Sequence, residues 1–170
     1  NLARDGSRKL HILADFDKTL TQAFVDSKSI PSLISILRDG NYLTKDYTQK
    51  AHALYEKYHP IEVNPKISLE EKKKAMYEWW RTHFDLLIQS KLNKKDLKKI
   101  VNSGKIKLRQ GIAEFLGLLY KNNIPLVILS SSGLGEDSIS MFLKSNNMFY
   151  DDIHIICNRY KWDNDDYAIS

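Results

Sequence analysis

The segment Asp15-Phe-Asp-Lys-Thr19 carries the residue types and spacing of a phosphoryl-transfer site. On an extended segment side chains alternate between two sides, so Asp15 and Asp17 are expected to point the same way. Two such carboxylates can hold Mg²⁺, and they can also act as nucleophile and general acid/base. Thr19 can hydrogen-bond the transferred phosphoryl group or hold the loop in place. The simpler alternative is that all three are turn residues after a strand.

A second segment that can bind phosphate follows the apolar run Ile124–Leu129. Ser130 and Ser131 offer hydroxyl and backbone donors there, and a turn flanked by glycines before a helix can bind an anion. Open α/β sheets bind ligands at the carboxyl ends of their strands. Two suitable segments at predicted strand ends therefore favour a functional site over a pair of polar turns.

The elements that must position these residues are of two kinds. The runs Lys9–Ala14, Ile124–Leu129 and Ile153–Cys157 predict strands, with helices expected over 110–120 and 137–144. Between Phe24 and Lys105 the pattern is helical, with helices expected at 32–38, from Thr44 to His59, from Ser68 through Leu87, and at 94–101. The sequence therefore predicts an α/β fold with a helical insert after its first strand.

Two local signals set boundaries inside the insert. Proline disfavours helical geometry in the residue before it, so His59-Pro60 is expected to end the helix that begins near Thr44. Ser68-Leu-Glu-Glu71 has the pattern of a capping box, which begins a helix.

Composition restricts the class of protein. The 170 residues are 42% hydrophobic and 28% charged, which excludes collagen-like, low-complexity and wholly disordered chains. No apolar run is long enough to cross a bilayer, and no signal-peptide pattern opens the chain, so we expect no membrane partner. The single cysteine, Cys157, suits a reducing compartment, and we expect a cytoplasmic protein.

The net charge of +5 is concentrated in the lysine-rich middle of the chain. A basic surface attracts anionic ligands, including nucleic acid. Isolated lysines without interleaved aromatic residues are more typical of a solvated helix face. We therefore do not expect a nucleic-acid partner, and RNA binding is kept as the weakest alternative.

Two sets of motifs in this chain resemble those of known protein families. Asp15-Phe-Asp-Lys-Thr-Leu-Thr21 resembles the first motif of the haloacid-dehalogenase (HAD) superfamily, and the strand ending at Ser130 is similar to its second. Segments of the insert resemble the helical cap of the cytosolic pyrimidine 5′-nucleotidases: Tyr55-Glu-Lys-Tyr-His-Pro-Ile-Glu62, Glu70-Glu-Lys72, Met76-Tyr-Glu-Trp-Trp80 and His83. The similarity continues from Ile124 through Asn158 and so covers most of the chain.

The resemblance implies a Rossmann-like, parallel-sheet HAD core, present in part, over residues 1–23 and 106–170, with a helical cap over 24–105. It implies Mg²⁺-dependent hydrolysis of nucleoside 5′-monophosphates such as CMP and UMP, through an aspartyl-phosphate intermediate. Asp15 would be the nucleophile and Asp17 the general acid/base, and Mg²⁺ would bind Asp15 and the backbone carbonyl of Asp17. Ser130 or Ser131 would bind the phosphoryl group, since the turn is one residue longer than the family pattern.

The same resemblance implies substrate contacts in the cap. Glu62 would face the base, where a carboxylate can accept from the exocyclic amine of cytosine. Thr82 matches a position at which the family often has a serine near the substrate. Trp79 and His83 are further candidates. Packing in the core of the cap is the alternative for both, and the apolar stripe of their helix favours packing over base stacking for Trp79.

The superfamily also uses a later lysine and a downstream acidic pair. The residues after Asn158 follow the third strand too closely for these roles, and Asp163–Asp166 has the pattern of a polar turn. We therefore expect a missing C-terminal part of the same protein to complete the site, and the first residue, Asn1, suits a partial chain. Two alternatives stay open: a non-catalytic nucleotide-binding module, and a nucleotidase of the same family that prefers 7-methylguanosine monophosphate.

Overall fold

The computed structural model describes residue 6 and residues 9–169, and these form two compact units. Unit 1 contains the described residues up to Ile36 together with Leu97–Arg159. Unit 2 contains Leu37–Asp96 and the described residues from Tyr160 onward. Helices α2 (Leu33–Asp39) and α5 (Lys94–Val101) each cross a boundary between the units.

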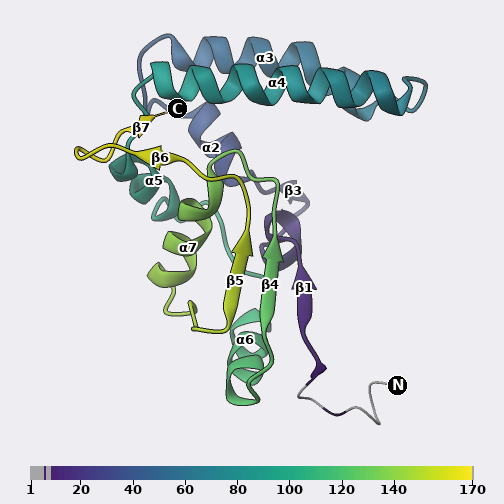
Figure 1. The fold of residues 1–170 in the computed structure, drawn as a ribbon, viewed down its shortest axis with the longest axis vertical. Helices are drawn as coiled ribbons and strands as arrows, with labels where there is room; N and C mark the ends of the chain where they lie inside the picture. The colour runs from purple at the N-terminus through teal and green to yellow at the C-terminus, as the bar shows by residue number, and fades with distance from the viewer. Residues whose placement is uncertain (1–5, 7–8, 170) are drawn as a thin grey trace. The chain divides into compact units, whose positions relative to one another are not determined.

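A three-stranded parallel sheet organises unit 1 (Figure 1). Its strands are β1 (Ile12–Ala14), β4 (Leu126–Leu129) and β5 (Ile153–Ile156), in the order β1-β4-β5. In register, Ile12 lies beside Leu126, and Leu126 lies beside Ile153. The predicted α/β class is confirmed, and β1 begins three residues later than expected.

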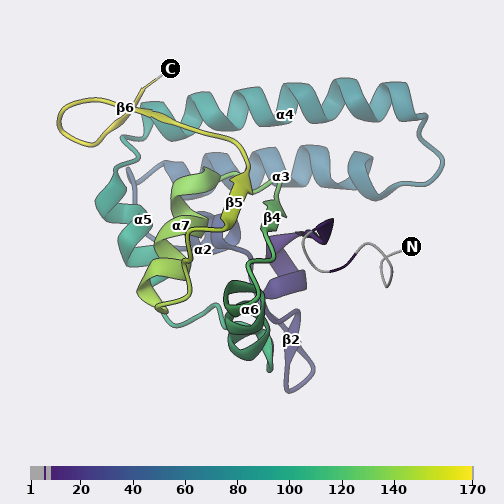
Figure 2. The same ribbon diagram turned by 60° about the horizontal axis from the view of Figure 1, so that its bottom comes forward.

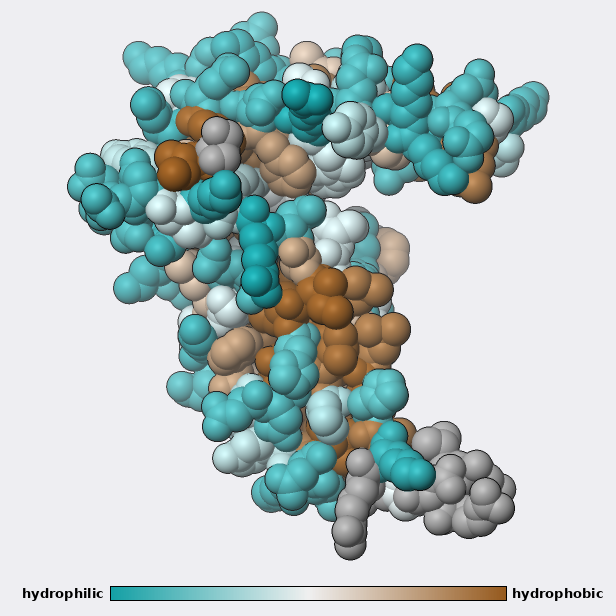
Figure 3. Space-filling view, viewed as in Figure 1, coloured by the Kyte–Doolittle hydropathy of each residue, from teal (hydrophilic) through white to brown (hydrophobic). Residues whose placement is uncertain are grey.

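The two faces of this sheet differ sharply in burial. Leu126, Ile128, Ile153 and Ile155 point into the core, where α7 (Gly135–Ser145) contacts β5. The opposite face carries exposed apolar side chains on all three strands: Leu13, Leu129 and Ile156. Figure 3 shows brown, apolar surface over the area where β1 and β4 lie in Figure 1. The period-two alternation of a strand thus leaves one apolar face open to solvent.

The remaining elements of unit 1 flank the sheet. A single π-type turn, η2 (Phe16–Leu20), follows β1, and a hairpin of β2 (Phe24–Val25) and β3 (Lys28–Ser29) follows that turn. Helix α6 (Ile112–Lys121) precedes β4, near the expected range. The sequence analysis missed the hairpin because its two-residue turn, Asp26-Ser27, has positive φ at both positions without the glycine that normally marks such a turn.

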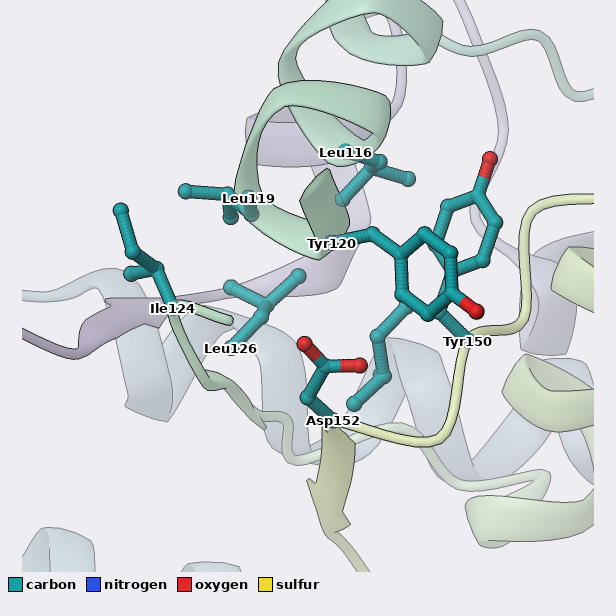
Figure 4. A pocket seen from close by; sticks show the side chains of 8 residues that line it. Leu116, Leu119, Tyr120, Ile124, Leu126, Tyr150 and Asp152 are labelled. Carbon is teal, nitrogen blue, oxygen red and sulfur yellow. The ribbon is translucent and has the colours of Figure 1, made fainter. Parts of the chain in front are cut away.

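A narrow pocket lies between α6 and the amino ends of β4 and β5 (Figure 4). Its wall includes Tyr120 and Tyr150, whose rings stack with centroids 4.6 Å apart. It lies at the sheet edge opposite the carboxyl ends of the strands, and it contains none of the predicted site residues.

Unit 2 is built on a helical hairpin. Helices α3 (Tyr47–Val63) and α4 (Leu69–Gln89) lie side by side in both ribbon views (Figure 2). The predicted capping box of α4 is confirmed: the backbone N–H of Glu71 donates to Ser68 Oγ at 3.2 Å, and the N–H of Ser68 donates to the Glu71 carboxylate at 3.2 Å. A short hairpin of β6 (Lys161–Trp162) and β7 (Ala168–Ile169) completes the unit, with the predicted turn between its strands.

The expected end of α3 at His59-Pro60 was wrong, because the helix continues through Pro60 to Val63. A proline inside a helix removes one backbone hydrogen bond, but packing on a neighbouring helix can offset that loss. Just before the proline, Tyr58 stacks on Trp79 of α4 and donates its hydroxyl proton to Glu78 at 2.6 Å. These contacts hold the last turn of α3 against α4.

The functional division into a core over 1–23 and 106–170 and a cap over 24–105 stays a prediction. Within the described part of the chain, the helices are all too short or too polar to cross a bilayer.

Candidate active site

The two aspartates lie in the loop after β1, and hydrogen bonds within this loop close it into a turn. The strand ends at Ala14, and Asp15 is extended with φ −82° and ψ 160°. The backbone N–H and the hydroxyl of Thr21 both donate to the carbonyl of Phe16, at 3.1 and 3.3 Å. The predicted end of the strand at Ala14 is therefore confirmed, and these bonds close the turn η2 that follows it.

Asp15 and Asp17 nevertheless lie within electrostatic reach of each other. The pKa of the Asp17 carboxyl is raised to about 6, first by burial and second by the charge of Asp15. Asp17 Oδ1 is buried without a hydrogen-bond partner in the described chain, while the backbone N–H of Leu33 bonds the carboxyl. The Thr19 hydroxyl donates to Asp15 Oδ2 over a long 3.4 Å. The carboxyl of Asp15 is therefore exposed, and the carboxyl of Asp17 is partly desolvated.

The two candidate phosphate ligands in the turn after β4, Ser130 and Ser131, differ in exposure. Ser130 is buried; its N–H donates to the carbonyl of Ile156 at 3.0 Å, and its Oγ accepts from the N–H of Ser132 at 3.2 Å. Ser131 is exposed. Ser132 Oγ is buried and has no partner among the described residues. Ser131 is thus the serine whose hydroxyl is open to a ligand.

The carboxyl end of β5 contributes two residues that the sequence analysis did not assign. The side-chain amide of Asn158 donates to the backbone carbonyl of Ser132 at 3.2 Å. The backbone carbonyl of Asn158 accepts from the N–H of Glu136 at 2.8 Å. Burial raises the pKa of the Cys157 thiol, and the charge of Asp17 acts in the same direction. The carboxyl ends of all three strands therefore meet at one site. These residues could have been predicted from the sequence, because they follow the third strand run and neighbouring parallel strands end at the same sheet edge.

The oxygen atoms after β1 suit a hard divalent cation. Mg²⁺ uses one or two carboxylates and keeps several waters, so it does not need a cage of protein ligands. Asp15 supplies an exposed carboxylate, and the unpartnered Asp17 Oδ1 is a buried acceptor that a bound ion or water could satisfy. Among the described residues, no group of three or more His, Cys, Asp or Glu side chains could hold a metal.

The predicted substrate residues of the insert all lie in unit 2. Glu62 is exposed and contacts His59 Nδ1 at 3.1 Å; it lies in the last turn of α3 because that helix continues past its expected end at His59-Pro60. Thr82 is exposed on α4, and its hydroxyl donates to the carbonyl of Glu78 at 2.8 Å. Trp79 is buried and stacks with Tyr58 and Trp80.

His83 is the most buried of the four predicted substrate residues, at 4% exposed. Burial lowers its pKa to about 4, with a smaller effect of the Arg38 charge, so the imidazole is neutral near pH 7. Its ring lies edge-on to Tyr47 and Trp80, and Nε2 has no partner in the part of the chain that the structure describes.

Comparison with known proteins places this chain in a family. The model of the pyrimidine 5′-nucleotidase (UMPH-1) family matches residues 18–170. The chain belongs to this family. The match begins inside the loop after β1 and includes the turn after β4 and the helical hairpin of unit 2.

Several relatives of this chain are named for a 7-methylguanosine nucleotide and not for a pyrimidine nucleotide. The chain is 33% identical over 164 residues to the human 7-methylguanosine phosphate-specific 5′-nucleotidase, covering 96% of this chain and 54% of the relative. It is 32% identical over 162 residues to the chicken protein of the same name, covering 95% and 55%. The chain therefore spans about half the length of the curated relatives it matches.

A solved structure has the same fold as this family member. The chain matches the crystal structure of cytosolic 5′-nucleotidase IIIB bound to cytidine with a TM-score of 0.82 and 24% identity, covering 98% of this chain and 57% of that one. The likeness supports the predicted α/β fold with a helical insert.

Proposed function

We propose that the protein containing this chain hydrolyses nucleoside 5′-monophosphates to nucleoside and phosphate. The observation that carries this proposal is the meeting of the Asp15–Asp17 loop and the Ser130–Ser132 turn at the carboxyl ends of β1 and β4, in a member of the pyrimidine 5′-nucleotidase family. Human and chicken relatives are named as 5′-nucleotidases. Cytoplasmic location remains part of the proposal.

The first half of the reaction uses the two carboxyls in different roles. An Asp15 oxygen attacks phosphorus, the bond between phosphorus and the 5′ oxygen breaks, and Asp17 donates its proton to that oxygen. A raised pKa suits Asp17 to this role, because the carboxyl keeps its proton at a higher pH than an exposed aspartate does. The product of this step is a nucleoside and an aspartyl-phosphate on Asp15.

In the second half, Asp17 accepts a proton from water, and the water oxygen attacks phosphorus. The bond to Asp15 breaks, which regenerates the carboxylate and releases phosphate. Thr19 and Ser131 are proposed to hydrogen-bond the phosphoryl oxygens; Ser130 is the less suitable ligand because it is buried, whereas Ser131 is exposed. Mg²⁺, held by Asp15 and the Asp17 carbonyl, would neutralise phosphoryl charge when bound.

For the base, we propose a pyrimidine nucleotide such as CMP or UMP, with Glu62, Trp79, Thr82 and His83 on the nucleoside side. The exposed carboxylate of Glu62 suits CMP, since it can accept from the exocyclic amine of cytosine. The names of the curated relatives favour a second candidate, 7-methylguanosine monophosphate.

The test is phosphate release from CMP, UMP and 7-methylguanosine monophosphate in the presence of Mg²⁺, using the full reading frame that contains these residues. Asp15→Asn should reduce kcat by about a thousandfold or more, because an amide is a poor nucleophile. Asp151→Asn, which removes a charge from an exposed turn, is the matched control. Unchanged activity in Asp15→Asn would exclude the mechanism.

The same assay separates the alternatives. Faster release from CMP and UMP supports the pyrimidine assignment, and faster release from the methylated nucleotide replaces it. Nucleotide binding by calorimetry without release of phosphate from any of the three would identify a non-catalytic module.

A further inference from the structure

The strongest unassigned feature near the proposed site is the side chain of Arg109. It lies in the segment that connects α5 to α6, ninety-one residues after the loop of Asp15 and Asp17. Its Nη2 donates to the backbone carbonyl of Lys18 at 2.6 Å. Lys18 stands between Asp17 and Thr19, two of the residues that the proposed reaction uses.

Lys18 has a backbone conformation that requires support. Its φ is 63° and its ψ is 4°, in the left-handed region that residues with a Cβ rarely occupy. Such a residue persists only where surrounding contacts hold it, at a cost of roughly 1 kcal/mol or more. Here the Lys18 N–H donates to Thr21 Oγ1 at 2.8 Å, and the Lys18 carbonyl accepts from Arg109. Both backbone polar groups of Lys18 are therefore hydrogen-bonded.

The backbone of the Arg109 segment is itself fixed to the same loop. The N–H of Arg109 donates to the carbonyl of Leu20 at 3.0 Å, and the N–H of Gln22 donates to the carbonyl of Lys107 at 2.9 Å. Thr21 and Leu108 form an antiparallel bridge between these two bonds. The guanidinium thus starts from an anchored backbone, so only the Arg109 side chain has to be ordered to form the bond to Lys18.

Arg109 acts on the backbone of the loop and not on the charge of its acid. The charges that influence the Asp17 carboxyl are those of Asp15 and Lys18. A charge-assisted hydrogen bond to a carbonyl is about twice as strong as a neutral one, and arginine offers it from a planar, directional group.

We propose that Arg109 is a positioning residue of the proposed phosphatase site: its guanidinium clamps the Lys18 carbonyl and so holds Asp17 and Thr19 at the angles needed for proton transfer and phosphoryl binding. The inference rests on the proposed function. It concerns catalysis and not nucleotide selection, because the predicted base contacts lie in unit 2.

The test compares Arg109→Met, Arg109→Lys and Lys107→Met in the full reading frame. Arg109→Met keeps the apolar stem without the donors, and it should lower kcat about tenfold or more while KM stays within about twofold, since small misplacement of reacting groups lowers rate steeply. Arg109→Lys retains one donor and should recover most of the loss. Lys107→Met removes the same charge from the same segment and should behave as wild type, since the Lys107 side chain is exposed.

A second readout does not depend on turnover. Amide hydrogen exchange at residues 18–21 should be about tenfold faster in Arg109→Met, with exchange in β4 and β5 unchanged. If the wild type releases no phosphate, the proposed function fails, and exchange still decides whether Arg109 holds the loop. The proposal is overturned if Arg109→Met leaves kcat and loop exchange unchanged, if Lys107→Met has the same effect, or if Arg109→Lys is as impaired as Arg109→Met.

Discussion

At the scale of single residues, burial decides what each carboxyl and imidazole can do. Asp15 and Asp17 are two positions apart, yet one is exposed and the other has a desolvated oxygen. Desolvation disfavours the charged form, so it raises the pKa of Asp17 and lowers that of His83. Both groups are therefore less charged near pH 6 than exposed residues of the same type.

The raised pKa of Asp17 predicts a stability effect with a defined sign. Because its pKa is about 6 in the folded state and 3.8 in the reference state, the folded protein is favoured below pH 3.8, and that advantage is lost as pH rises through 6. Asp17→Asn should therefore stabilise the metal-free protein at pH 7.5, by on the order of 2 kcal/mol. Urea unfolding at pH 7.5 and pH 4 measures this difference.

The gain should disappear at pH 4, where wild-type Asp17 is protonated. Asp151→Asn, on an exposed turn, should change stability little at either pH. A loss of stability in Asp17→Asn at pH 7.5 would contradict the assignment of a desolvated carboxylate.

At the scale of elements, the start of α4 follows from a local signal, whereas the end of α3 depends on tertiary contacts. The capping box of α4 begins that helix where the pattern indicated, because it uses only residues three positions apart. The end of α3 depends on Tyr58 and its partners on α4, which no local pattern reveals.

Removing the side chain that caps the start of α4 should therefore have a modest and local effect on stability. Ser68→Ala loses the acceptor for the Glu71 N–H and should destabilise unit 2 by about 1 kcal/mol. Ser68→Asp keeps an acceptor at the same position and should stay within a few tenths of a kcal/mol of wild type. Thermal unfolding compares the three proteins; equal losses in both variants would mean that the side-chain bond contributes nothing.

At the scale of the whole molecule, the parallel sheet has one buried and one open apolar face. Parallel sheets in α/β proteins are normally covered on both faces. Here Leu13, Leu129 and Ile156 are exposed, and an apolar area of this kind favours association.

Substitutions at two adjacent residues of β5 test which face of the sheet is buried and which is exposed. Ile156 is 57% exposed and Ile155 is 8% exposed. In the 170-residue chain, Ile156→Lys should change the free energy of unfolding by less than about 0.5 kcal/mol and reduce self-association, whereas Ile155→Lys should cost about 3 kcal/mol or more by burying a charge. Thermal unfolding and sedimentation measure the two effects, and similar losses in both variants would contradict the assignment of faces.

The sequence by itself determined the α/β class, the strand runs that lead into Asp15 and Ser130, and the family, because apolar periodicity and short motifs depend on near neighbours in the chain. It also indicated which serines and carboxyls could bind phosphate. Only the tertiary structure decided that Ser130 is buried and Ser131 open, that Asn158 joins the site, that α3 passes through Pro60, and that Arg109 holds Lys18. Those outcomes depend on desolvation and on contacts between residues as far as ninety-one positions apart, and neither is a property of any local segment.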